Sequence, residues 1–222
     1  AAVLRPARNL DDVVTTDSLV EGVHFRREWS PPETIGYKAL AVNLSDLASM
    51  GAAPRASRHG LALPADFPLS DFDALIDGYL DLAKASGACL VGGNMTRSPG
   101  PVVVDVTAIG TVGHRRALRR EGARRGDELY VTGTLGSAAA ALGMLQARGS
   151  RDEIQSSAAD CLARYERPEP RLRFGGIVGR ARAAAAGMDL SDGLADAASR
   201  LAHAGGIGVV IDARTLPMLE SA

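Results

Sequence analysis

Residues 38–54 form an apolar helical pattern that contains a single carboxylate, and this stretch constrains the fold most strongly. Leu40, Leu44 and Leu47 recur at the spacing of one helical face, whereas Asp46 lies on a neighbouring stripe among small and apolar residues. Such an acid is predicted to be partly buried, and a buried charge is costly unless a cation or hydrogen-bond donors compensate it. The alternative is an acid at the helix surface.

The first half of the chain alternates strand-like and helix-like segments. Ser30, Pro31 and Glu33 have the pattern of a capped helix start, and Gly51 before Pro54 is expected to end that helix. Apolar and β-branched runs predict strands at residues 11–17, 58–63, 89–91 and 101–112, and an amphipathic run predicts a second helix at residues 70–87.

An arginine-rich segment, HRRALRREGARRGD, predicts a boundary between a domain of residues 1–113 and a domain of residues 114–222. Beyond it, residues 129–131 and 208–212 have strand patterns, and Ser191 is the predicted cap of a helix that runs to His203. The alternation lacks the long parallel regularity of a doubly wound sheet. The predicted fold class is therefore α+β.

Composition excludes several classes of protein. The net charge of −1 among 222 residues gives no global attraction to nucleic acid, and no apolar run is long enough to span a membrane. The 2 cysteines show no zinc-site spacing and are expected to be reduced. We therefore expect a cytoplasmic protein without nucleic-acid or membrane partners.

Three further short stretches place compact oxygen ligands beside a strand-like run or a helix start. They read TTD at residues 15–17, GGN at residues 92–94 and DLSD at residues 189–192. Two unit charges about 4 Å apart repel by about 4 kcal/mol at an effective dielectric near 20, so carboxylates that cluster need cations or shifted pKa values. Hard oxygens without sulfur suit Mg²⁺. The predicted ligands are the carboxylates of Asp17, Asp46, Asp189 and Asp192 and the neutral groups of Thr15, Thr16 and Asn94.

Other motifs leave alternatives open. There is no Walker P-loop and no GxGxxG after a strand, and phosphate could still be bound through metals. The arginines of residues 115–125 suit a solvated surface, a nucleic-acid patch or a phosphate clamp. His24 suits a substrate contact or a turn.

Taken in order, five segments of the chain resemble the thiamine-monophosphate kinase family, within the superfamily that includes aminoimidazole ribonucleotide synthetase. They are TTDSLVEGVHF, KALAVNLSDLASMGAAP, LVGGNMTRS, REGARRGDELYVTGTLG and MDLSDGLADAASRLA. The resemblance implies a two-domain α+β fold, with an N-terminal mixed sheet with helices that pairs in a homodimer, and a C-terminal α+β domain. ATP and Mg²⁺ would lie between the two domains.

The resemblance also implies residue roles. Asp46, Asp17 and Asp189 would be the catalytic carboxylates, and His24 would contact thiamine monophosphate. The family's metal-binding positions match Thr15, Thr16, Asp17, Asp46, Asn94, Asp189 and Asp192, and its nucleotide contacts match Gly93, Asn94, Arg120 and Ser191. Some members carry Asp at the position of Asn94, so weaker metal binding is expected there.

The chain departs from the family pattern at both ends. Family members have a Gly-Asp-Asp just before the residues that match Ala1 and Ala2, and they continue past Ala222 to residues that contact thiamine. The sequence is expected to hold most of the metal and ATP site and part of the substrate pocket. The alternatives are another ATP-dependent member, of the aminoimidazole ribonucleotide or selenophosphate synthetase type, and a nucleotide-binding maturation partner without turnover.

Overall fold

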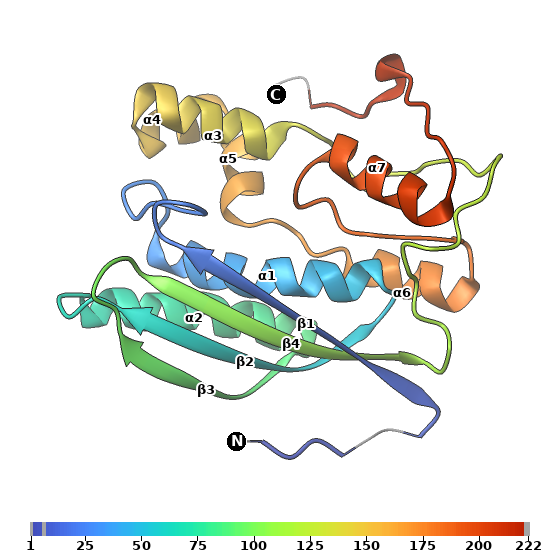
Figure 1. Ribbon diagram of the computed structural model, residues 1–222. Helices are drawn as coiled ribbons and strands as arrows, with labels where there is room; N and C mark the ends of the chain where they lie inside the picture. Colours follow the sequence, from blue (N-terminus) through green and yellow to red (C-terminus); the bar gives the residue numbers. More distant parts are fainter. Residues whose placement is uncertain (1, 6–7, 220–222) are drawn as a thin grey trace.

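A four-stranded mixed sheet forms the first half of the chain in the computed structural model, which describes residues 2–5 and 8–219 (Figure 1). The strands are β1 (Leu10–Val20), β2 (Ala53–Leu63), β3 (Cys89–Arg97) and β4 (Val103–Gly113), in the order β1-β4-β2-β3. β4 is antiparallel to both β1 and β2, and β2 is parallel to β3. β1 and β3 therefore lie at opposite edges.

Two helices, α1 (Pro32–Ser49) and α2 (Leu69–Ser86), cover one face of this sheet (Figure 1). The predicted apolar face of α1 is confirmed, because Leu40, Leu44 and Leu47 are fully buried. A methyl group on Gly36 would overlap the Leu75 carbonyl, so glycine lets the two helices approach closely. Among the described residues, no helix covers the opposite sheet face.

The second half of the chain is mainly helical. It contains α3 (Ser137–Arg148), α4 (Arg151–Ser157), α5 (Ala159–Glu166), α6 (Leu172–Ala181) and α7 (Leu194–Gly205). Leu145, Ile154 and Leu162 form a second apolar core between α3, α4 and α5. α6 packs against the end of α1, where a methyl group on Gly175 would overlap the Ala48 carbonyl.

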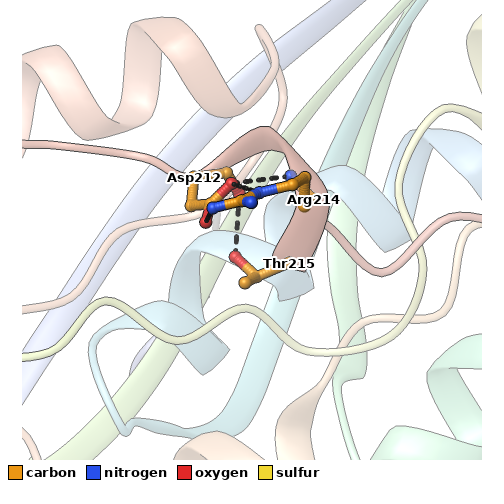
Figure 2. A network of polar contacts seen from close by, with 3 residues as sticks. All are labelled: Asp212, Arg214 and Thr215. Carbon is orange, nitrogen blue, oxygen red and sulfur yellow. Dashed lines mark hydrogen bonds and ion pairs between the residues drawn. The ribbon is translucent and has the colours of Figure 1, made fainter.

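The predicted strands of the second half are wrong. Residues 129–131 and 208–212 carry no strand in the described part of the chain, because no neighbouring segment there completes a ladder. The second segment instead leads into a 3-10 turn, η1 (Ala213–Thr215). Figure 2 shows that Asp212 accepts hydrogen bonds from the Arg214 backbone and guanidinium, and that Thr215 Oγ1 donates to the Asp212 carbonyl at 2.8 Å.

The predicted helix caps are also wrong, although the α+β class is confirmed. α1 begins after Pro31 without a side-chain cap, so Ser30 and Glu33 form no capping box, and Gly193 rather than Ser191 precedes α7.

β3 runs through residues 92–93, where the sequence predicted a break, because glycine tolerates the φ of 148° at position 92. No helix in the described residues is long and apolar enough to cross a membrane.

Candidate active site

The acidic site is built where β1 passes beside the last turn of α1. Alternation along β1 buries Val13 and Leu19 under the helices, which places Thr15 and Asp17 on the same face. The Thr15 hydroxyl donates a hydrogen bond to the Asp46 carboxylate of α1. The predicted partial burial of Asp46 is confirmed. Its hydrogen-bond donor, Thr15, lies 31 positions earlier in the sequence, on β1.

The third carboxylate, Asp189, comes from the segment between α6 and α7. The backbone around it lies against the end of α1, because a Cβ on Gly187 would lie 3.0 Å from the Ser49 carbonyl oxygen. The Gly187 N–H donates to the Arg119 carbonyl at 3.0 Å, which joins this segment to the arginine-rich connection. Asp189 and Arg120 are thereby brought beside Asp46, and both alter its pKa.

Burial and mutual repulsion disfavour the charged form of these acids. Burial raises the pKa of Asp46, with Asp189 adding to the rise and the Thr15 hydrogen bond and Arg120 opposing it. Burial also raises the pKa of Asp17, with further contributions from Asp46 and Asp189, and His24 opposes the rise. The negative end of the α1 dipole lies at this turn. The cluster therefore has the electrostatics of a site that needs a cation.

The donor set fits Mg²⁺, since Thr15, Asp17, Asp46 and Asp189 offer hard oxygens. Within residues 2–5 and 8–219, however, no three Asp, Glu, His or Cys side chains already form a metal-binding group. The carboxylates of Asp17, Asp46 and Asp189 interact electrostatically, but they are not close enough together to bind one ion. A bound cation would have to draw them together.

Several predicted residues lie apart from this cluster in a single chain. Thr16 faces the uncovered sheet face and donates to the Val106 carbonyl at 3.0 Å. Ser191 and Asp192 lie on an exposed bend, and Asp192 interacts electrostatically with Arg200 of α7.

The Gly93-Asn94 segment lies on the far edge of the sheet. Asp17, Val106, His59 and Gly93 form one row across the four strands. With neighbouring strands about 4.8 Å apart, the ends of this row are roughly 14 Å apart. Asn94, the next residue, projects from the opposite face because strand side chains alternate. Within one chain, Asn94 and Asp17 are therefore too far apart to share a metal ion.

Sequence reasoning missed Asp105 of β4. Its carboxylate accepts a hydrogen bond from Ser18 at 2.5 Å, and its charge adds to the rise in the pKa of Asp17. The available signal was a lone acid inside the most strand-like run of the chain, VVVDVTAIGTV.

Comparisons with known proteins identify the family of this chain. Family models for AIR synthase related proteins match residues 1–112 with the N-terminal domain and residues 124–222 with the C-terminal domain. The thiamine-monophosphate kinase of Synechococcus elongatus is 40% identical over 226 aligned residues, covering 100% of this chain and 68% of that protein.

Two solved structures show the same fold. The thiamine-monophosphate kinase of Stenotrophomonas maltophilia aligns with a TM-score of 0.91 and 40% identity, covering 100% of this chain and 69% of the other. AaThiL, solved in complex with AMPPCP and TMP, aligns with a TM-score of 0.89 and 31% identity, covering 98% of this chain and 68% of the other. The present chain thus spans about two thirds of their length, and it belongs to the thiamine-monophosphate kinase family of AIR synthase related proteins.

Proposed function

We propose that this protein transfers the γ-phosphoryl group of ATP to the phosphate of thiamine monophosphate, giving thiamine diphosphate and ADP, in a Mg²⁺-dependent reaction. The observation that carries the proposal is the electrostatic interaction of Asp17, Asp46 and Asp189, which come from three separate segments, in a chain of this kinase family. Two anions must meet in line in such a reaction. Charge neutralisation and positioning therefore matter more than a protein nucleophile.

The acidic cluster would hold Mg²⁺, which when bound would neutralise charge on the phosphate oxygens. Asp46 would bridge metal ions, with Asp17 and Asp189 completing their coordination. The Thr15 hydroxyl fixes the Asp46 carboxylate by donating to Oδ2. Arg120, whose charge acts on Asp46, would steady the nucleotide phosphates, and His24, whose charge acts on Asp17, would contact the phosphate of thiamine monophosphate.

The remaining predicted ligands complete the proposal. Asp192, Thr16 and Asn94 would join the metal site, and Gly93, Asn94 and Ser191 would contact ATP, in a cleft between domains of residues 1–113 and 114–222. A kinase works where ATP is supplied, so we also propose a cytoplasmic location without nucleic-acid or membrane partners.

We further propose that the active form is a homodimer in which Gly93 and Asn94 of one copy reach the acidic cluster of the other. Two observations support this arrangement. The strand order separates Asn94 from Asp17 by roughly 14 Å in one chain. One sheet face is also left uncovered by the described residues, and it carries Val14, which is 63% exposed.

The deciding experiment measures ADP release by the full-length protein with ATP and Mg²⁺, comparing thiamine monophosphate, thiamine, the aminoimidazole ribonucleotide precursor and selenide as acceptors. Turnover with thiamine monophosphate alone, with thiamine diphosphate as product, is the expected result. Turnover with another acceptor would favour one of the other superfamily activities. ATP binding without turnover on any acceptor would favour a maturation partner.

A further inference from the structure

The Glu21 carboxylate stabilises the turn of residues 21–27, which follows β1, through two hydrogen bonds. Its Oε2 accepts the Val102 N–H at 2.9 Å, and its Oε1 accepts the Arg27 Nε–H at 2.7 Å. The side chain is 18% exposed. Burial alone would raise its pKa, but the hydrogen bonds from Val102 and Arg27 outweigh burial and lower the pKa of Glu21. Glu21 is therefore charged at neutral pH, with both oxygens in use.

The turn of residues 21–27 is closed by its own backbone. The Gly22 N–H donates to the Phe25 carbonyl at 2.8 Å, and the His24 N–H donates to the Val20 carbonyl at 2.9 Å. Phe25 is buried beneath the turn and anchors it to the main core. Between Glu21 at one end and Arg27 at the other, His24 is held at the tip.

The turn also fixes the state of the His24 ring. The Val20 N–H donates to His24 Nδ1 at 3.0 Å. A ring nitrogen that accepts a hydrogen bond carries no proton, so the neutral ring has its proton on Nε2. With this hydrogen bond in place, His24 offers a single N–H donor, on Nε2, and the ring lies near enough to Asp17 for the two side chains to interact electrostatically. A ligand of this donor must offer an acceptor, as a phosphate oxygen does.

We propose that Glu21 is a positioning residue, which holds the turn of residues 21–27 so that His24 offers Nε2–H to a phosphate oxygen of the acceptor substrate. The inference rests on the proposed function for the identity of that substrate. Glu21 acts only through His24, since its own oxygens bond to Val102 and Arg27 on the sheet side of the turn.

A double-mutant cycle in the full-length protein tests this role. Glu21→Ala is expected to raise KM for thiamine monophosphate about tenfold, while kcat and KM for ATP change less than about twofold. Glu21→Gln, which keeps an acceptor for the Val102 N–H, should restore most of the loss. In a His24→Ala background, Glu21→Ala should add almost nothing, because the group that it positions is gone.

Glu169→Gln supplies the matched control. Glu169 is an exposed glutamate that pairs with Arg171 at 2.5 Å rather than with Val102 or Arg27, and Glu169→Gln should leave KM unchanged. Additive effects of Glu21→Ala and His24→Ala, or a fall in kcat with KM unchanged, would overturn the inference.

A second measurement needs no substrate. Nitrogen-15 NMR of the histidine rings, with the His24 signal assigned by its loss in His24→Gln, reports which nitrogen carries the proton. The Nε2–H form is expected in the parent protein and a mixture of forms in Glu21→Ala. An unchanged His24 signal in Glu21→Ala refutes the positioning role even if no kinase activity is found. An absence of turnover beside the expected NMR change refutes only the proposed function.

Discussion

Asp46 is the residue on which the site depends, because it meets β1 through Thr15 and the second half of the chain through Asp189 and Arg120. We predict that Asp46→Asn lowers kcat at least about a hundredfold, since metal binding and phosphate positioning both fail. The raised pKa means that the charged carboxylate destabilises the folded state near neutral pH. The free energy of unfolding of the variant should therefore be unchanged or slightly higher.

Steady-state ADP release and urea unfolding at pH 7.5 measure the two halves of this prediction. Asp12→Asn is the matched control, because Asp12 lies on the same strand and pairs with Arg55 at 3.6 Å, away from the cluster. Near-normal turnover in Asp46→Asn would refute the proposal that Asp46 binds Mg²⁺.

The same pKa shifts predict how metal binding depends on pH. Burial raises the pKa values of both Asp17 and Asp46 above the ordinary 3.8, so these acids take up protons at a higher pH than free aspartate does. Mg²⁺ binds the charged form, and its affinity should fall as the pH drops toward the raised pKa values of these acids. Thermal unfolding with and without Mg²⁺ measures this, because a ligand of the folded state raises Tm.

The rise in Tm with Mg²⁺ should be larger at pH 7.5 than at pH 5, and Asp46→Asn should abolish it at both. A rise of equal size at the two pH values, or one that persists in Asp46→Asn, would place the Mg²⁺ elsewhere.

The sequence predicts the neighbours of a residue within its own helix or strand, but it does not predict contacts with residues distant in the chain. The apolar neighbours of Asp46 predicted partial burial correctly because they lie within one helical turn. Asn94 was grouped with Asp17 because both flank strand-like runs. The order of strands decides their separation, and the insertion of β4 between β1 and β2 has no local signal.

At the scale of elements, α1 joins the parts of the molecule. Its start contacts α5, its length packs on the sheet and on α2, and its end meets α6. Near the start, Lys38 Nζ lies 4.2 Å from the centre of the Tyr165 ring, and the Arg167 guanidinium lies 5.0 Å from the Tyr37 ring. The two cation–π contacts are reciprocal, with one cation from each side of the junction.

Lys38 gives this junction a testable dependence on pH. Burial lowers its pKa from 10.5 to about 8, although Glu166 opposes the shift. Between about pH 8 and pH 10.5 the unfolded chain binds more protons than the folded protein does, so the free energy of unfolding rises with pH over this range. The stability gained from a neutral Lys38 is fully present above pH 10.5 and is lost as the pH falls through about 8. The change is at most about 3 kcal/mol, and less because the side chain keeps some contact with water.

Urea unfolding at pH 7.5 and pH 9.5 of the parent protein, Lys38→Met and Lys84→Met measures this effect. Lys84 is exposed in the last turn of α2 and is the matched control. Lys38→Met should lose the gain in stability between the two pH values, whereas Lys84→Met should keep it. An identical gain in all three proteins would mean that Lys38 titrates normally.

Element types in the first half followed from the sequence because hydrophobic periodicity there matches the packing. α2, for example, ends at Gly87 in a left-handed conformation, as the sequence predicted. The strand predictions for residues 129–131 and 208–212 were wrong, because a segment with high strand propensity forms a strand only beside a partner strand, and none lies beside them in the described chain. Exposed Tyr130 and Val210 mark the same two segments.

At the scale of the whole molecule, the proposed homodimer predicts complementation between two inactive variants. Asp46→Asn disables the acidic cluster, and Asn94→Lys places a cation where Mg²⁺ is proposed to bind. Asn94 is exposed on edge strand β3, so the fold should tolerate the lysine. In a mixed dimer whose sites combine Asp46 of one copy with Asn94 of the other, one site carries both substitutions and the second carries neither.

Random mixing of equal amounts makes half of the dimers mixed, each with one intact site, so about a quarter of the parent activity should return. Sedimentation equilibrium shows whether the protein is a dimer. Native mass spectrometry with one variant labelled with nitrogen-15, after the two variants are unfolded and refolded together, shows whether chains have exchanged. If each site lay within one chain, every chain in the mixture would still carry a disabling substitution, and activity would not rise above the sum of the separate variants. Dimers that exchange chains without recovering activity would therefore place Asn94 in the site of its own chain, and monomers would refute the proposed assembly itself.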